Sequence, residues 1–194
     1  EIPLNADFES GFSGTPEGVG DNVRFAVEAG VSGLSIEDYT GDRKEPLFPI
    51  EVAVERIKAA RAAIDAAGAD TVLTGRSEGF LRGRPDLDET IKRLKAYSDA
   101  GADCLYAPLA IAPEQITAIV QAVAPKPVNV LVSSFDRGVV DYAKLGVRRL
   151  STGSALAAAA WGGFMRAAKD LAENGSFKGF EGSASGAEIV KSFQ

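Results

Sequence analysis

"EAGVSGLSIED" (residues 28–38) contains the turn that decides the fold, because the chain uses the same arrangement three more times. Each copy consists of the end of a helical pattern, a glycine, a few linking residues and a short apolar run that ends in polar residues. The other copies are "AAGADTVLTGRSE" (66–78), "DAGADCLYAPLA" (99–110) and "KLGVRRLSTGS" (144–154). A glycine just after a helix adopts the left-handed conformation that lets the chain reverse into the next strand. The sequence therefore predicts four turns of the helix-to-strand type.

Helical periodicity fills the segments between these turns. Ile50, Val54, Ile57 and Ile64 recur at helical spacing within residues 50–67, which places them on one face. We expect strands near residues 2–8, 32–38, 71–77, 104–109, 127–132 and 148–152, and helices near residues 16–29, 50–67, 87–100, 113–123, 136–145 and 154–173. Strict alternation of strands and helices predicts an α/β fold with a parallel sheet covered by helices.

The similarity of these units favours a (β/α)8 TIM-type barrel over a doubly wound sheet, and no GxGxxG motif follows the first strand. A complete barrel of eight βα units needs about 250 residues, whereas the 194 residues contain six identifiable βα units. We therefore expect the first two βα units of the barrel to be missing before Glu1. We assign residues 1–173 to the barrel domain and residues 174–194 to a C-terminal tail.

Composition and charge restrict the function. The net charge of −6 argues against nucleic acid or an anionic membrane as a partner, since both select basic surfaces. No apolar run is long enough to predict a membrane span, and the single cysteine, Cys104, favours a reducing compartment, so we expect a cytoplasmic protein. Histidine is absent, which removes the commonest general base and the usual zinc ligand. Catalysis would therefore depend on carboxylates, other polar side chains or a metal held by oxygen.

Acidic side chains follow several of the expected strands. Asp7 and Glu9 come at the end of the first strand, Glu37 at the end of the second and Arg76 at the end of the third. The carboxyl ends of parallel strands meet at one edge, and residues two apart in a strand share a face. Carboxylates crowded in this way need a cation, and ligands that are all oxygen suit Mg²⁺ or Mn²⁺. We predict that Asp7, Glu9 and Glu37 bind the metal directly or through water, while Arg76 clamps a substrate carboxylate.

Structural roles for the same residues stay open. Each acid taken alone suits a helix cap or a turn amide, and Arg76 could pair with Glu37 or Glu78 only to stabilise the fold. The convergence of three acids on one edge favours the metal site over these alternatives.

Several motifs together carry a family likeness. "LNADFESGF", "GLSIEDYTGD", "VLTGRSEGFL", "LDETIKRLKAYSDAGADCLYAP", "PVNVL" and "LGVRRLSTGSAL" occur in order within residues 2–172. With them the chain resembles the isocitrate lyase/phosphoenolpyruvate mutase superfamily, and most of all its short phosphoenolpyruvate mutase-like and carboxyvinyl-carboxyphosphonate phosphorylmutase-like members. The resemblance implies a (β/α)8 barrel, Mg²⁺ and a small α-keto acid or its enolate. It also implies a homotetramer whose C-terminal helix is exchanged between neighbours.

The resemblance assigns roles to particular residues. It matches Asp7 and Glu9 with the acids of the family's metal-binding strand, Glu37 with the glutamate of its "IED" motif and Arg76 with its substrate arginine. The lyase branch carries a "KKCGH" loop, whereas residues 38–51 here read "DYTGDRKEPLFPIE", with neither Cys nor His.

We assign catalytic roles to four residues and substrate contacts to three on the basis of these patterns. The catalytic set is Arg76, Glu37, Arg43 and Lys44, and the substrate-binding set is Arg76, Tyr39 and Asn129. Tyr39, Arg43 and Lys44 lie on a loop that is a candidate lid.

The sequence predicts a Mg²⁺-dependent lyase or hydrolase that cleaves a C–C bond in a small α-keto or 2-hydroxy dicarboxylate through a metal-bound enolate. One alternative is a mutase or hydrolase that acts on the P–C bond of a phosphonate. A second alternative is a non-catalytic protein that binds a metal and a keto acid.

Overall fold

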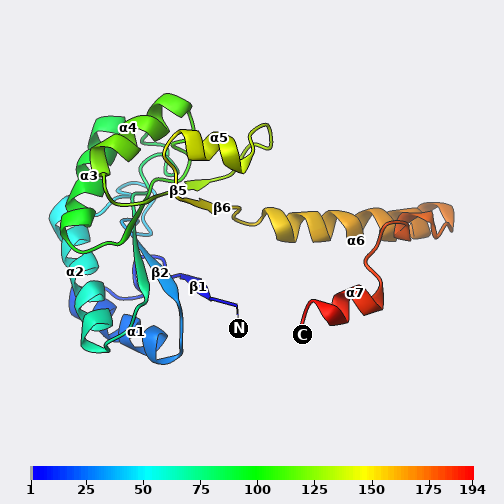
Figure 1. The fold of residues 1–194 in the computed structure, drawn as a ribbon, viewed down its shortest axis with the longest axis horizontal. Coiled ribbons are helices and arrows are strands. Elements are labelled where there is room, and N and C mark those ends of the chain that lie inside the picture. Colours follow the sequence, from blue (N-terminus) through cyan, green and yellow to red (C-terminus); the bar gives the residue numbers. More distant parts are fainter. Residues whose placement is uncertain (1) are drawn as a thin grey trace. The chain divides into compact units, whose positions relative to one another are not determined.

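A computed structural model describes residues 2–194 and divides into two compact units, the first ending at Ser151 and the second spanning Thr152–Gln194. Strands and helices alternate along the first unit (Figure 1). Its elements are β1 (Asn5–Asp7), α1 (Pro16–Glu28), β2 (Gly33–Glu37), α2 (Ile50–Ala66), β3 (Val72–Arg76), α3 (Leu87–Asp99), β4 (Cys104–Tyr106), α4 (Pro113–Val123), β5 (Val128–Leu131), α5 (Val139–Lys144) and β6 (Arg149–Ser151). The strands are parallel and pair in sequence order from β1 to β6. The predicted alternation and parallel sheet are confirmed.

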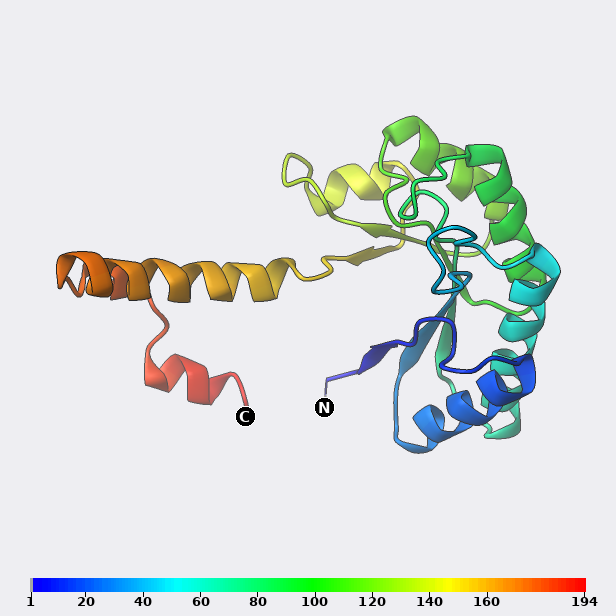
Figure 2. The same cartoon turned by 180° about the vertical axis from the view of Figure 1, so that it is seen from behind.

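The sheet is curled into a half-barrel with one apolar and one polar face. Helices α1–α5 cover its convex face in both views (Figures 1 and 2). Leu34, Leu73 and Leu105 are fully buried there in the hydrophobic core. Side chains alternate along a strand, so Ser35 and Thr74, which adjoin these leucines in sequence, lie on the concave face. The polar side chains of the strands therefore gather on the concave face, which none of the described helices of this unit covers.

Glycines end the helices as the repeat predicts. Gly30, Gly68, Gly101 and Gly146 follow α1, α2, α3 and α5, and each has a positive φ between 62° and 105°. At Gly146 an added Cβ would also lie 2.7 Å from a Val120 methyl group. All four predicted helix-to-strand turns are confirmed.

All six strands are shorter than predicted, and a left-handed residue follows two of them, β1 and β4. β1 ends at Asp7 instead of residue 8, and Glu9 takes a φ of 45°. β4 ends at Tyr106 instead of residue 109, and Leu109 takes a φ of 66°. Left-handed residues interrupt the extended conformation, so the chain leaves the sheet earlier than the apolar pattern indicates.

The second unit contains α6 (Ala155–Asn174), the short 3-10 helix η1 (Lys178–Phe180) and α7 (Gly186–Lys191). Gly179 packs against α6 so closely that a Cβ there would lie 2.6 Å from the Ala167 Cα. The structure groups α6 with the tail, and our division at residue 173 stays a prediction. Among residues 2–194, no helix combines the length and apolar character needed to cross a membrane.

Candidate active site

One row of side chains crosses the concave face near the carboxyl ends of the strands. The strand register places Glu37 opposite Arg76, Arg76 opposite Tyr106, Tyr106 opposite Asn129, and Asn129 opposite Arg149. Glu37, Arg76 and Tyr106 are the last residues of β2, β3 and β4. The parallel register therefore brings together residues that lie far apart in the sequence.

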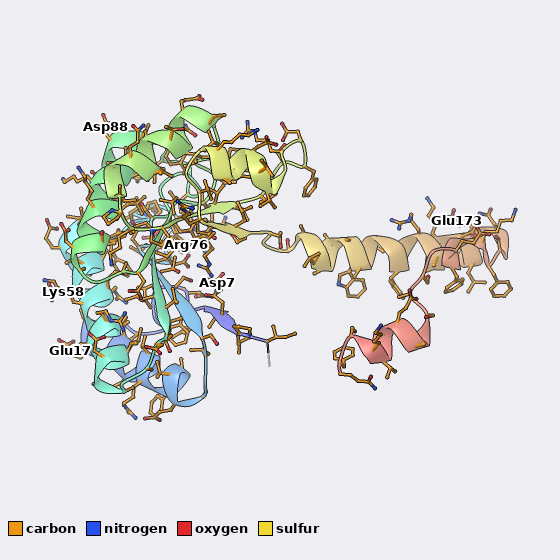
Figure 3. The ribbon with its side chains drawn as sticks, viewed as in Figure 1. Asp7, Glu17, Lys58, Arg76, Asp88 and Glu173 are labelled. Atoms are coloured by element: carbon orange, nitrogen blue, oxygen red, sulfur yellow. The ribbon has the colours of Figure 1, made fainter. Side chains whose placement is uncertain are left out.

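Arg76 is the centre of a cluster of carboxylates. Its Nε lies 2.5 Å from Glu78 Oε1 and 3.2 Å from Glu37 Oε2, and its Nη1 lies 3.4 Å from Asp7 Oδ1. Asp7 and Arg76 lie on the inner side of the sheet in Figure 3, whereas Glu17 and Lys58 project from the outer helices. The structure thus brings together three of the predicted residues, Asp7, Glu37 and Arg76, and adds Glu78.

Burial controls the charges of this cluster. The Glu78 side chain is fully buried and the Glu37 side chain is 6% exposed. Burial above all, together with the carboxylates of Glu78 and Asp7, raises the pKa of Glu37 to about 7 against the opposing effect of Arg76. Burial lowers the pKa of Arg76, but the neighbouring carboxylates outweigh it, so that the pKa is raised overall. A carboxyl group with a pKa near 7 can exchange its proton with a substrate at neutral pH.

The cluster has an excess of negative charge when Glu37 is ionised. Arg82 Nε lies 2.8 Å from Glu78 Oε2, so two guanidinium groups face the carboxylates of Asp7, Glu37 and Glu78. Glu37 Oε2 is buried and lacks a hydrogen-bond donor among residues 2–194, because Arg76 Nε approaches it outside hydrogen-bond geometry. A buried carboxylate oxygen is costly unless it is paired or coordinates a metal, so Glu37 Oε2 is a candidate metal ligand.

The fit of these residues to Mg²⁺ depends on how many carboxylates the ion needs. Among residues 2–194, no group of three or more Asp, Glu, Cys or His side chains is placed to hold a metal ion. Mg²⁺ usually binds one or two carboxylates and fills its remaining positions with water and substrate oxygens. Asp7, whose side chain is 72% exposed, and the unpaired oxygen of Glu37 fit this smaller requirement.

Contrary to the sequence prediction, Glu9 does not lie beside Asp7 on a strand. Asp7 and Glu9 do not share a strand face, because β1 ends at Asp7 and Glu9 has a positive φ. The Glu9 carbonyl accepts the Glu37 N–H at 2.8 Å, while the side chain is exposed. The metal-binding roles of Asp7, Glu9 and Glu37 stay predictions.

The loop after β2 lies beside the cluster. A bridge between Tyr39 and Leu47 closes this loop, and Arg43 and Lys44 are exposed on it. The Arg82 guanidinium lies 3.6 Å from the centre of the Tyr39 ring. Tyr39 thus contacts the cluster through Arg82, whereas Arg43 and Lys44 form no ion pair with it in the described part of the chain. The catalytic roles of Arg43 and Lys44, and the substrate contact of Tyr39, stay predictions.

Asn129 presents a free acceptor to the concave face. Its Nδ2 donates to Ser151 Oγ at 3.0 Å, whereas its buried Oδ1 lacks a hydrogen-bond partner in the described residues. Arg76 lies over the Tyr106 ring, with 5.2 Å between the guanidinium carbon and the ring centre. Asn129 lies on β5 and Arg76 on β3, so β4 separates the two residues. The substrate contact of Asn129 stays a prediction.

The sequence analysis gave no role to a second buried group, which lies behind the cluster. Asp38 accepts hydrogen bonds from the Glu78 N–H, the Tyr97 O–H and Arg93 Nη1 at 2.7, 2.6 and 3.2 Å. The one available signal was the spacing of Arg93 and Tyr97, four residues apart on the buried face of α3.

Comparison with known proteins places this geometry in a family. Residues 1–172 match the family model described as phosphoenolpyruvate phosphomutase. The chain is 32% identical over 162 residues to oxaloacetate decarboxylase of Paraburkholderia xenovorans, and the aligned region covers 80% of this chain and 51% of that protein. It is 33% identical over 120 residues to 2-methylisocitrate lyase of Escherichia coli, which covers 60% of this chain and 38% of that protein. The chain spans about half, or less, of the length of these curated relatives.

Solved structures agree with the sequence comparisons. A putative lyase/mutase from Burkholderia cenocepacia superposes with a TM-score of 0.91 at 44% identity, covering 99% of this chain and 69% of that one. Oxaloacetate acetylhydrolase in complex with its product oxalate superposes with a TM-score of 0.81 at 28% identity, covering 98% and 65%. All four of these relatives bear the names of enzymes. The chain belongs to the phosphoenolpyruvate phosphomutase family, within the isocitrate lyase/phosphoenolpyruvate mutase superfamily.

Proposed function

We propose that this chain is part of a Mg²⁺-dependent lyase or hydrolase that cleaves a C–C bond in a small α-keto or 2-hydroxy dicarboxylate by way of an enolate. The observation that carries the proposal is the cluster of Asp7, Glu37, Arg76 and Glu78, which offers a guanidinium and excess negative charge at one site. Relatives named oxaloacetate decarboxylase and oxaloacetate acetylhydrolase support this substrate class, because oxaloacetate is an α-keto dicarboxylate.

Each residue of the cluster has a role in this chemistry. The contacts to Glu78, Glu37 and Asp7 use Nε and Nη1 of Arg76. The third nitrogen of the guanidinium, Nη2, can therefore bind a substrate carboxylate. Glu37 can hold or deliver a proton at Oε2, because its pKa lies near 7. Asp7 would bind Mg²⁺, with Glu9 and Glu37 holding its waters. Mg²⁺, when bound, would stabilise negative charge that develops on the substrate's carbonyl oxygen.

The two edge strands of the sheet support a proposal about the complete fold. Strands β1 and β6 each have one neighbour in the sheet. We propose that the six strands are part of a closed (β/α)8 barrel, since the chain covers 69% of the similar lyase/mutase structure.

The second unit has an unusually apolar surface, which supports the proposal of a homotetramer. Leu156, Trp161, Phe164 and Met165 of α6 are all more than 60% exposed, and a contiguous apolar surface is typical of a protein interface. Trp161→Glu with Phe164→Glu is expected to reduce the assembly's mass, measured by light scattering. An unchanged mass would contradict the proposal.

P–C bond chemistry is the second candidate, because the matching family model is described as phosphoenolpyruvate phosphomutase. Arg43 and Lys44 are exposed cations on the loop beside the cluster, and such cations can bind a phosphoryl group. Release of phosphate from phosphonopyruvate would favour this candidate over C–C cleavage.

A substrate panel tests the proposal. The full chain with Mg²⁺ is expected to cleave oxaloacetate, either to pyruvate and CO₂ or, with water, to oxalate and acetate, and Asp7→Ala is expected to abolish this cleavage. Asp88→Asn is the matched control, since Asp88 is an exposed carboxylate on α3, away from the cluster (Figure 3). Tight binding of oxalate without turnover of any substrate would favour the non-catalytic alternative.

A further inference from the structure

Asp38 forms hydrogen bonds to both ends of the turn that joins Arg76 to its partner Glu78. It is 1% exposed and follows Glu37 at the end of β2. Its backbone N–H donates to the Arg76 carbonyl at 3.2 Å, and its Oδ1 accepts the Glu78 N–H at 2.7 Å. In addition, the Ser77 N–H donates to the Tyr106 carbonyl at 2.8 Å. One residue therefore holds both ends of the short turn 76–78.

The other oxygen of the same carboxylate is fixed from α3. Asp38 Oδ2 accepts the Tyr97 O–H at 2.6 Å and Arg93 Nη1 at 3.2 Å. Arg93 also donates to the Phe48 carbonyl at 2.9 Å, so the carboxylate's neutralising cation is itself held in place. Burial and the charge of Asp38 raise the pKa of Tyr97, so the phenol remains a donor at neutral pH. These bonds leave the Asp38 carboxylate a single orientation.

Glu78 transmits this orientation to Arg76. Its backbone is fixed by Asp38, and its fully buried side chain reaches back along the turn to Arg76 Nε at 2.5 Å. A guanidinium held through Nε presents its remaining N–H groups in one plane. The direction of that plane thus depends on where the Glu78 backbone lies.

We infer that Asp38 is a positioning residue, which fixes Glu78 and through it orients the Arg76 guanidinium toward Asp7 and the substrate. The substrate part of this inference rests on the proposed function. The orientation of Arg76 can be measured whether or not the protein turns over any keto acid.

Side-chain NMR tests the orientation directly. In the wild-type chain, the Glu78 amide and the Arg76 Nε–H, assigned by loss of its signal in Arg76→Lys, are expected to exchange slowly with solvent. Exchange of both groups at solvent rates in the wild-type protein would overturn the inference, even if the variants failed to fold. Asp38→Asn is expected to shift or broaden the Arg76 Nε–H signal, because one amide cannot accept from all three donors.

Tyr97→Phe is the matched control, since it removes one donor from Asp38 and leaves the Glu78 N–H bond. It should leave the Arg76 Nε–H signal close to its wild-type position. An equal effect of Tyr97→Phe and Asp38→Asn, or no effect of Asp38→Asn, would show that Asp38 only stabilises the fold.

Oxalate with Mg²⁺ serves as the binding probe in a separate titration. Asp38→Asn is expected to raise the dissociation constant of oxalate about tenfold or more, as for residues that orient a direct ligand, and Tyr97→Phe to leave it close to wild type. Unchanged affinity in a folded Asp38→Asn protein would overturn the positioning role. Failure of the wild-type protein to bind oxalate would instead count against the proposed function, while the NMR result would still decide the orientation.

Discussion

Replacing Arg76 with methionine removes the cation that the buried carboxylates share. The Glu78 side chain is fully buried and that of Glu37 is 6% exposed, so their charges cannot be solvated in its place. Loss of one partner from a buried ion pair costs about 3–5 kcal/mol. Arg82 still neutralises Glu78 from 2.8 Å, so we expect Arg76→Met to lower the free energy of unfolding by about 3 kcal/mol, at the lower end of that range. For a chain of this size, this corresponds to a fall in melting temperature of roughly 6–12 °C.

A double-mutant cycle with Glu78→Gln isolates the interaction. Urea denaturation followed by circular dichroism should show Arg76→Met/Glu78→Gln to be less destabilised than the sum of the two single variants. The loss in Arg76→Met should also be smaller at pH 5 than at pH 8, because Glu37 is mostly protonated below its pKa of about 7. Additive effects, or an unchanged melting temperature in Arg76→Met, would refute the reasoning.

Three further predictions concern Glu37, Arg56 and the exposed cations of the loop after β2. Because the folded-state pKa of Glu37 is raised from 4.5 to about 7, the folded protein binds this proton more tightly than the unfolded chain. The free energy of unfolding should therefore decrease as pH rises through this window, by at most about 1.4 kcal/mol per pH unit, and Glu37→Gln should reduce this slope in urea titrations. Arg56 is 2% exposed and donates to three backbone carbonyls within residues 10–14. Arg56→Met should therefore lower the free energy of unfolding by on the order of 2–3 kcal/mol and speed proteolysis within residues 10–14. An unchanged rate of cleavage in this segment would contradict the prediction. Arg43→Ala with Lys44→Ala should lower turnover while leaving the melting temperature nearly unchanged, because both side chains are exposed; full activity would remove them from the catalytic set.

Local patterns predicted the elements of the first unit well. Glycine at the ends of α1–α3 and the spacing of apolar residues mark α1–α4 to within one residue at each end. These signals are local, since a C-cap or an amphipathic face depends on neighbours within one or two turns. Helix α5 is three residues shorter at its start than predicted, and α7 was not predicted, although Ser185 and Glu188 form a capping box at its start.

The site was predicted less completely, for physical reasons. The carboxyl ends of parallel strands had to meet, so Asp7, Glu37 and Arg76 could be placed near one another from sequence. The period-two argument failed at Glu9, because a single left-handed residue is not visible as a pattern when it is not a glycine. The bond from Tyr97 to Asp38 joins residues 59 apart, and such pairings depend on how α3 packs on the sheet.

Calorimetric titration of Mg²⁺ in the presence of oxalate tests the central claim most directly. We predict that the wild-type chain and Asp88→Asn bind Mg²⁺ alike, and that Asp7→Ala loses this binding or weakens it at least about tenfold. Equal binding of Mg²⁺ by the wild-type chain and Asp7→Ala would contradict the claim that the carboxylates around Arg76 form a metal site.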